Sequence, residues 1–145
     1  MTDALDKFVN DLQAEINEDT RRTYGEIVFR RWQNPLYMGK LIPADGYARL
    51  TGSCGDTMEI FLRLEDGKIK EASFLTDGCA SSMVCGSFAA ELAIGKTPEE
   101  IKEITGETIL EILGGLPEED RHCAFLAADT LRKSLEHYLK PGGKK

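Results

Sequence analysis

The sequence has no long apolar run, and none of its cysteines forms a close pair. No segment approaches the roughly 20 consecutive apolar residues of a membrane-spanning helix, so a membrane protein is not expected. The 145 residues carry a formal net charge of −7, which disfavours nucleic acid and anionic membranes as partners. The N-terminus, MTDALDKFVNDLQ, is acidic and amphipathic, unlike a secretory signal or a transit peptide. We therefore expect a cytoplasmic protein with one globular domain.

The four cysteines are too few for a disulfide-rich secreted scaffold. They are Cys54, Cys79, Cys85 and Cys123, and no CxxC pair occurs among them. The absence of such a pair disfavours a zinc ribbon and a thioredoxin-like site. In a reducing compartment, spaced cysteines are more often metal-binding or catalytic than disulfide-bonded.

Hydrophobic periodicity predicts an α+β protein. Helices are expected over residues 4–16, about 21–33, 81–94, a segment beginning at Thr97, 108–113 and about 121–139. Strands are expected over residues 47–51, 58–64 and 69–76, with EDG at 65–67 as a hairpin turn. The last helix is expected to bury Phe125, Ala128, Leu131, Leu135 and Tyr138.

Three of the four cysteines lie where loops meet regular elements. Cys54 precedes a strand within GSCGDT, with Asp56 two residues later. Cys79 lies between a strand and a helix, and Cys123 follows His122 near a helix start. Backbone N–H groups and the helix dipole favour thiolate over thiol at such helix starts. The pattern predicts that these residues share one site.

Each candidate also has a structural interpretation. A single cysteine is often a small buried hydrophobe. Asp56 would serve as a turn or strand-entry residue, and His122 as an exposed helix-start residue. Cys85 differs from the other cysteines, because it lies inside a predicted helix near the face that carries Phe88 and Leu92. Packing is the favoured interpretation for Cys85.

The ordered motifs resemble the IscU/NifU-type scaffold proteins, on which iron–sulfur clusters are assembled. The matching pieces, which cover about residues 24–138, are YGEIVFRRWQNPLYMG, GSCGD, DGKIKEASFLTDGCASS, GKT and HCAFLAADTLRKSL. The resemblance implies a small antiparallel sheet of about three strands, with helices packed on one face and the cysteines clustered at one end. It divides the chain into an N-terminal helical extension (1–23), a scaffold domain (24–139) and a disordered tail (140–145).

The resemblance implies a scaffold rather than an enzyme. A transient 2Fe-2S cluster would be built from iron and desulfurase-derived sulfur and then passed to apo-proteins. Cys54, Cys79 and Cys123 match the cluster cysteines, and Cys123 matches the sulfur acceptor. Asp56 matches an aspartate that assists assembly and keeps the cluster labile, and His122 matches a possible fourth ligand. A carboxylate or imidazole in the fourth position suits a site that must release its cluster.

The resemblance also implies partners. A cysteine desulfurase would supply sulfur, frataxin or a ferredoxin would supply iron or electrons, and apo-proteins would receive the cluster. Many family members carry a Pro-Pro-Val-Lys stretch that a dedicated Hsp70-type chaperone binds. Here the stretch is LPEEDRHC, so that chaperone is not expected. Cys85 also departs from the family, which usually has a small hydroxyl residue or alanine there.

Two other functions compete. A zinc-binding interaction or regulatory module could use the same three cysteines with Asp56 or His122, and zinc could occupy the cluster-free form of a scaffold. A thiol enzyme could use Cys123 as nucleophile and His122 as base. The enzyme is disfavoured, because adjacent helical residues point about 100° apart and therefore pair poorly, and no third orienting group is evident.

Overall fold

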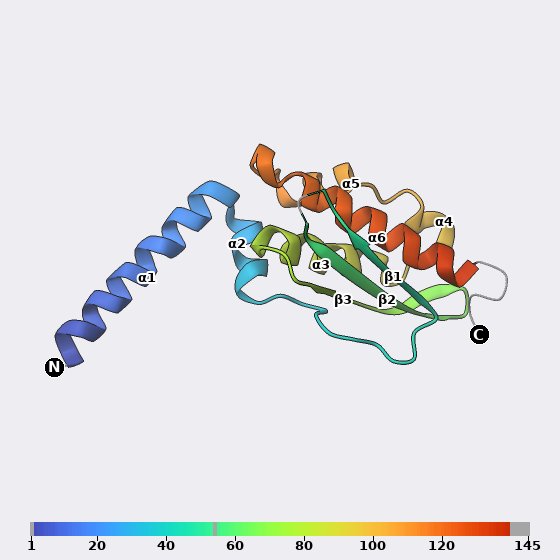
Figure 1. Cartoon of the computed structure of the whole chain (residues 1–145), viewed down its shortest axis with the longest axis horizontal. Coiled ribbons are helices and arrows are strands. Elements are labelled where there is room, and N and C mark those ends of the chain that lie inside the picture. The colour runs from blue at the N-terminus through green and yellow to red at the C-terminus, as the bar shows by residue number, and fades with distance from the viewer. Residues whose placement is uncertain (1, 54, 140–145) are drawn as a thin grey trace.

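A three-stranded antiparallel sheet carries helices on one face (Figure 1). This computed structural model describes residues 2–53 and 55–139. The strands are β1 (Gly46–Thr51), β2 (Thr57–Glu65) and β3 (Lys68–Thr76), in the order β1-β2-β3. The helices are α1 (Thr2–Tyr24), α2 (Glu26–Gln33), α3 (Ala80–Ala93), α4 (Pro98–Ile101), α5 (Gly106–Leu113), the 3-10 helix η1 (Glu118–Asp120) and α6 (His122–Leu139). The predicted α+β fold is confirmed.

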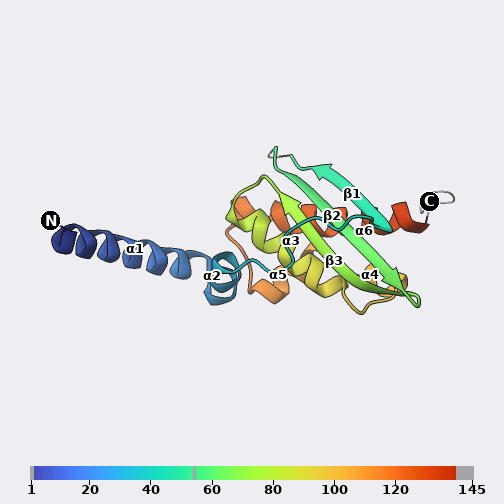
Figure 2. The same ribbon diagram turned by 90° about the horizontal axis from the view of Figure 1, so that it is seen from below.

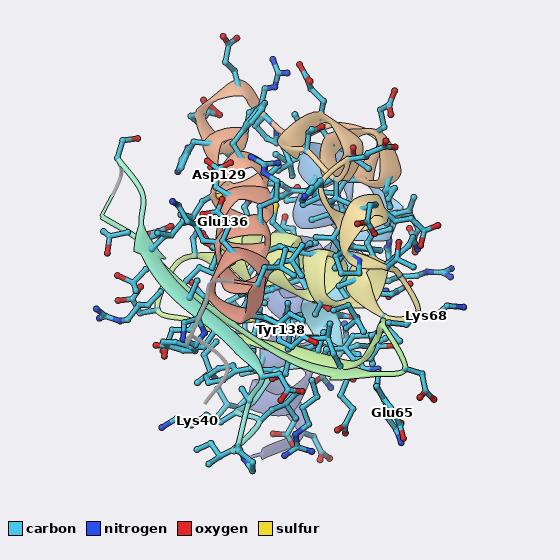
Figure 3. All side chains as sticks on the ribbon, turned by 90° about the vertical axis from the view of Figure 1, so that its right-hand side faces the viewer. Lys40, Glu65, Lys68, Asp129, Glu136 and Tyr138 are labelled. Carbon is cyan, nitrogen blue, oxygen red and sulfur yellow. The ribbon has the colours of Figure 1, made fainter. Side chains whose placement is uncertain are left out.

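The sheet forms because apolar residues alternate along its central strand. Met58, Ile60 and Leu62 of β2 are fully buried on the helix side, and Ile60 pairs with Phe74 of β3. The β2–β3 turn places residues 66 and 67 at φ values of 57° and 78°. Two consecutive positive φ values match the twist of a tight hairpin. Figure 3 shows the hairpin end of the molecule, where Glu65 and Lys68 point outward.

Helices α3 and α6 cover the sheet, α3 on β3 and α6 on β1 and β2, as Figure 2 shows from the sheet side. Glycine permits the close approach at two points. A Cβ at Gly46 of β1 would lie 2.4 Å from the carbonyl oxygen of Ser134, and one at Gly86 of α3 would lie 2.6 Å from the ring of Phe74. No helix in the described part of the chain is both long and apolar enough to cross a membrane.

Three details of the predicted helices are wrong. The boundary between the first two helices lies at Gly25, and not between residues 16 and 21 as predicted. Helix α1 continues to Tyr24, and Gly25 turns the chain at a φ of 91°. The helix predicted from residue 108 begins at Gly106, because Thr105 and Thr108 form a reciprocal capping box. Phe125 is 38% exposed, because its ring packs over Gly106, the first residue of α5, and not within the core cluster. The predicted start at Thr97 is confirmed by its capping box with Glu100.

Neighbouring segments bind the outer edge of β3. The backbone of Phe74 exchanges two hydrogen bonds with residues 37–39, with N···O distances of 2.9 and 3.0 Å. Further along the strand, the backbone of Ile69 exchanges two with residues 95–96, at 2.8 and 2.9 Å. The guanidinium of Arg63 donates to two carbonyls of the same α2–β1 connection, those of residues 42 and 43. The connection is therefore fixed against the sheet.

Candidate functional site

The candidate residues that the structure describes meet at one end of the sheet. Asp56 directly precedes β2, Cys79 is the N-cap residue of α3, and His122 and Cys123 open α6. Cys54 lies outside the described residues, so its role stays a prediction. The ligand atoms of Asp56, His122 and Cys123 all lie within 4.8 Å of one another. The structure thus brings Asp56 together with two adjacent residues, His122 and Cys123, that are far from it in the sequence.

The spacing of these atoms suits a shared metal. Tetrahedral ligands about 2.0–2.3 Å from a metal lie roughly 3.5 Å from one another. The Sγ of Cys123 lies 3.7 Å from the Nε2 of His122. The expectation that these adjacent residues pair poorly is therefore wrong. His122 is the first residue of α6, and no earlier helical turn restricts its ring.

Ser82 connects the site, and the sequence interpretation missed it. Its side chain is fully buried. Its Oγ lies 2.8 Å from the Oδ2 of Asp56, 3.3 Å from the Sγ of Cys123 and 4.0 Å from the Sγ of Cys79. The signal was present in GCASS, because a residue three positions after an N-cap cysteine lies on the same side of the helix start.

One hydroxyl carries a single proton, so Ser82 donates to the Asp56 carboxylate or to the Cys123 sulfur, but not to both at once. An ionised carboxylate can only accept. While Cys123 is a thiol, its S–H can donate to the Ser82 oxygen as that hydroxyl donates to Asp56. The three groups then form a continuous path along which a proton can leave the buried sulfur.

Burial keeps Cys123 protonated. Its side chain is fully buried, and this burial raises the pKa of its thiol to about 12, although the hydrogen bond from Ser82 acts in the opposite direction. The expectation that a helix start makes Cys123 a ready thiolate is therefore wrong, because desolvation outweighs the helix dipole. Metal binding at this sulfur must release a proton.

Among the cysteines that the structure describes, Cys79 is exposed, in contrast to Cys123. A small cavity of about 100 Å³ opens beside it, lined by Tyr24, Val28, Trp32, Ala80 and Ser81. A partner that reaches Cys79 therefore meets an apolar hollow at the neighbouring start of α3.

Gly78 leaves the space that the Asp56 carboxylate occupies. A Cβ at this position would lie 2.6 Å from the Oδ2 of Asp56 and 2.7 Å from the Oγ of Ser82. Real Cβ contacts are essentially never so short, so any other residue must displace one of these groups. The glycine in TDGCASS is thus part of the site.

Asp120 forms a second set of contacts beside the site. The hydroxyl of Ser81 donates to its Oδ2 at 3.1 Å, and the phenol of Tyr24 also hydrogen-bonds to it. Burial raises the pKa of Tyr24, and the negative charge of Asp120 raises it further. Asp120 therefore connects the end of α1, the start of α3 and the segment that leads into α6. The sequence interpretation noted the acidic LPEEDRHC only as a departure from the family.

Cys85 lies in the core. It is fully buried on α3, and burial raises the pKa of its thiol well above the usual value. Its neighbours in the same hydrophobic cluster include Val84, Phe88 and Ala89. This environment supports the packing interpretation.

Known proteins share this sequence and architecture. The family profile described as "NifU-like N terminal domain" matches residues 23–144. The iron-sulfur cluster assembly scaffold protein IscU 1 of Archaeoglobus fulgidus is 42% identical over 122 residues, which are 83% of this chain and 80% of that protein. The scaffold protein IscU of Azotobacter vinelandii is 34% identical over 125 residues, which are 83% of this chain and 97% of that protein.

The fold is also found among solved structures. The N-terminal part of a NifU-like protein from Brucella abortus superposes with a TM-score of 0.66 at 20% identity, over 83% of this chain and 96% of that one. At this identity the likeness concerns the fold alone. Together with the family profile and the relatives, it gives the same assignment: the chain belongs to the family of NifU-like N-terminal domains, which includes IscU scaffold proteins.

Proposed function

We propose that this protein is a scaffold on which an iron–sulfur cluster is assembled and from which it is passed to recipient proteins. One observation carries the proposal. The ligand atoms of Asp56, His122 and Cys123 converge within 4.8 Å, in a chain whose relatives are named as assembly scaffolds. The protein would act by holding and releasing its cargo, not as an enzyme.

The proposed cargo is a 2Fe-2S cluster. Cys54, Cys79 and Cys123 would supply thiolates, and Asp56 or His122 would complete the set. Three thiolates with one oxygen or nitrogen ligand hold a cluster less firmly than four thiolates, which suits transfer. Zinc accepts the same ligands, and it could occupy the cluster-free form. A zinc-binding regulatory module is not favoured as the main function, because the relatives are named for iron–sulfur cluster assembly.

We propose Cys123 as the sulfur acceptor. Its thiolate would attack the outer sulfur of a persulfide on a cysteine desulfurase, which leaves a persulfide on Cys123 and a thiol on the donor. The proton of Cys123 must leave first, and the imidazole of His122 lies 3.7 Å from its sulfur. Because Cys123 is fully buried, a local opening at the start of α6 must precede this attack.

The proposed partners follow from the same role. A cysteine desulfurase would give sulfur, an iron or electron donor such as frataxin or a ferredoxin would complete the cluster, and apo-proteins would receive it in the cytoplasm. The exposed Cys79 and the adjacent hollow offer these proteins a contact point. The dedicated Hsp70-type chaperone stays unexpected, because Asp120 and its acidic neighbours replace the stretch that it would bind.

The test is anaerobic incubation with a cysteine desulfurase, cysteine and ferrous iron, followed by visible absorption. We expect a 2Fe-2S spectrum from the natural protein and none from Cys54→Ser, Cys79→Ser or Cys123→Ser, because a serine hydroxyl stays protonated and binds iron poorly. The matched control is Cys85→Ser, which should retain assembly. No visible band from the natural protein, or equal damage from Cys85→Ser, would refute the assignment.

A second variant tests whether the site is built for release. Asp56→Ala removes a hard oxygen ligand from beside soft thiolates. The variant should hold its cluster longer and transfer it more slowly to an apo-ferredoxin. Asp129→Ala, on the outer face of α6, is the control and should match the natural protein. An Asp56→Ala protein with unchanged cluster lifetime and transfer rate would remove Asp56 from the proposed site.

A further inference from the structure

Helix α1 extends away from the body of the protein (Figures 1 and 2). It carries an exposed apolar stripe. Residues 2–22 lie outside the match to the family profile, which begins at residue 23. The stripe consists of five side chains that are 45–63% exposed: Leu5, Phe8, Val9, Leu12 and Ile16. A helix in water owes most of its stability to packing of such a face. The stripe therefore needs a partner surface.

The last turn of α1 is fixed to α2, which keeps the stripe away from the body. The guanidinium of Arg21 lies 2.9 Å from the carboxylate of Glu26, and its central carbon lies 4.3 Å from the centre of the Phe29 ring. These contacts span the turn at Gly25. They hold α1 in its extended direction, so the body of the same chain does not cover the stripe.

The spacing of the stripe is that of a short coiled coil. With Val9 and Ile16 at heptad positions a, Leu5 and Leu12 fall at positions d. β-branched residues at a with leucine at d are the combination that favours two strands in parallel coiled coils. The outer positions b, c and f hold mainly polar residues and alanine: Asp3, Ala4, Lys7, Asn10, Asp11, Ala14, Asn17, Glu18 and Arg21.

The charges beside the stripe permit pairing of two identical helices. In a parallel pair each g residue faces the e residue five positions later on the other helix. Phe8 then faces Gln13, and Glu15 faces Thr20, so no like charges oppose each other. A membrane surface fits less well, because α1 has six acidic and three basic residues, whereas helices that lie on membranes are rich in lysine and arginine.

We propose that the exposed stripe of α1 pairs with the same stripe of a second copy of this chain, forming a short parallel two-stranded coiled coil. The apolar a and d positions span two heptads, because the next d residue is Asp19. The association is therefore reversible and concentration-dependent. Since α1 ends at Tyr24, which contacts Asp120 beside the candidate site, a parallel pair brings two such sites to the same end. The pairing itself does not depend on the proposed scaffold function.

Sedimentation velocity on the full chain under reducing conditions tests the pairing, over about 1 to 500 µM. We expect a monomer–dimer equilibrium in this range. Leu12→Asp at position d should raise the dissociation constant at least about tenfold, because it puts a charge in the packed seam. Ala14→Asp at position f adds the same charge on the outer face and should keep the natural value. Circular dichroism checks that both variants keep the folded body.

A crosslink tests the parallel orientation. Leu5→Cys should give a dimer linked through residue 5 on mild oxidation, because facing d positions of a parallel pair lie close enough for a disulfide. In an antiparallel pair residue 5 faces residue 16, about 16 Å along the helix from its own copy. Lys7→Cys at position f is the control and should not link.

Three results with this chain alone would overturn the proposal. They are a natural protein that stays monomeric throughout the range, a dimer that Leu12→Asp leaves intact, and a dimer in which Leu5→Cys does not link. A stable complex of α1 with a different protein, without self-association, would assign the stripe to another occupant and also overturn it.

Discussion

Replacing Ser82 by alanine tests how the site controls its buried sulfur. The change removes a hydroxyl that lies 3.3 Å from the Sγ of Cys123. In the natural protein, the hydrogen bond from this hydroxyl lowers the pKa of the Cys123 thiol. A hydrogen bond to a charged group contributes roughly 1.5–3 kcal/mol, and Ser82 shares its single proton with Asp56. We therefore expect a loss near the lower end, about 1.4 kcal/mol, which corresponds to one pKa unit. At any pH below the pKa, the thiolate fraction of Cys123 should fall about tenfold.

The assay is alkylation of the reduced, metal-free protein with iodoacetamide at about pH 8, followed by peptide mapping. Only the thiolate reacts, so the rate at Cys123 follows the thiolate fraction. A small free thiol in the same mixture serves as the internal reference, because Cys79 itself lies within 4.0 Å of the Ser82 hydroxyl. The ratio of the two rates should fall about tenfold in Ser82→Ala. The control is Ser87→Ala, a buried serine of the same helix whose hydroxyl donates to the carbonyl of Leu36.

The sign of the change decides the test. Alanine is smaller than serine, so the substitution gives the reagent at least as much access to Cys123. A lower rate therefore cannot result from access and must reflect a higher pKa. An unchanged or higher ratio would show that Ser82 does not stabilise the thiolate of Cys123.

Three further substitutions have defined outcomes. Gly78→Ala should displace the Asp56 carboxylate and weaken ferrous iron binding in an anaerobic titration. The control is Gly52→Ala, whose Cβ makes only ordinary contacts from 3.4 Å. Equal iron affinities of the two variants would contradict this prediction. Asp120→Asn should lower the pKa of Tyr24 towards its usual value of about 10. In an ultraviolet titration, one phenol should then ionise at lower pH than in the natural protein. An unchanged titration curve would show that the Asp120 carboxylate has no influence on Tyr24. Gly46→Ala should lower the free energy of unfolding by about 1–3 kcal/mol through overpacking against the Ser134 carbonyl. Urea denaturation measures this loss, with Gly52→Ala as the control. A loss no larger than that of the control would refute the close contact.

The fold was largely predictable because local patterns and packing agree. The alternation from Met58 to Leu64 predicts a strand buried on one face, and Thr97 with Glu100 predicts a helix start. The boundary at Gly25 was missed, because helical spacing continues on both sides of a glycine whose positive φ only the structure shows. Phe125 was misplaced because periodicity identifies an apolar side chain but not the element that covers it.

The site was predictable in its composition but not in its energetics. The motifs bring Asp56, His122 and Cys123 into one group, and the structure places their ligand atoms together. Cys54 lies outside the described residues, so the complete ligand set stays a prediction. The protonation of Cys123 was predicted wrongly, because a sequence shows the position of a helix start but not the depth of burial. Ser82 was missed for a related reason, since its role depends on three distances between segments distant in the chain.

The hydrogen bonds along the outer edge of β3 affect how the protein behaves at high concentration. An uncovered edge strand offers a row of donors and acceptors to which a strand of another molecule can add, and such addition leads to aggregation. In β3 the backbone groups of Phe74 and Ile69 already bond to residues 37–39 and 95–96. A strand from a neighbouring molecule would have to displace these segments first. The α2–β1 connection and the α3–α4 loop therefore protect this edge from amyloid-like growth, in addition to linking elements.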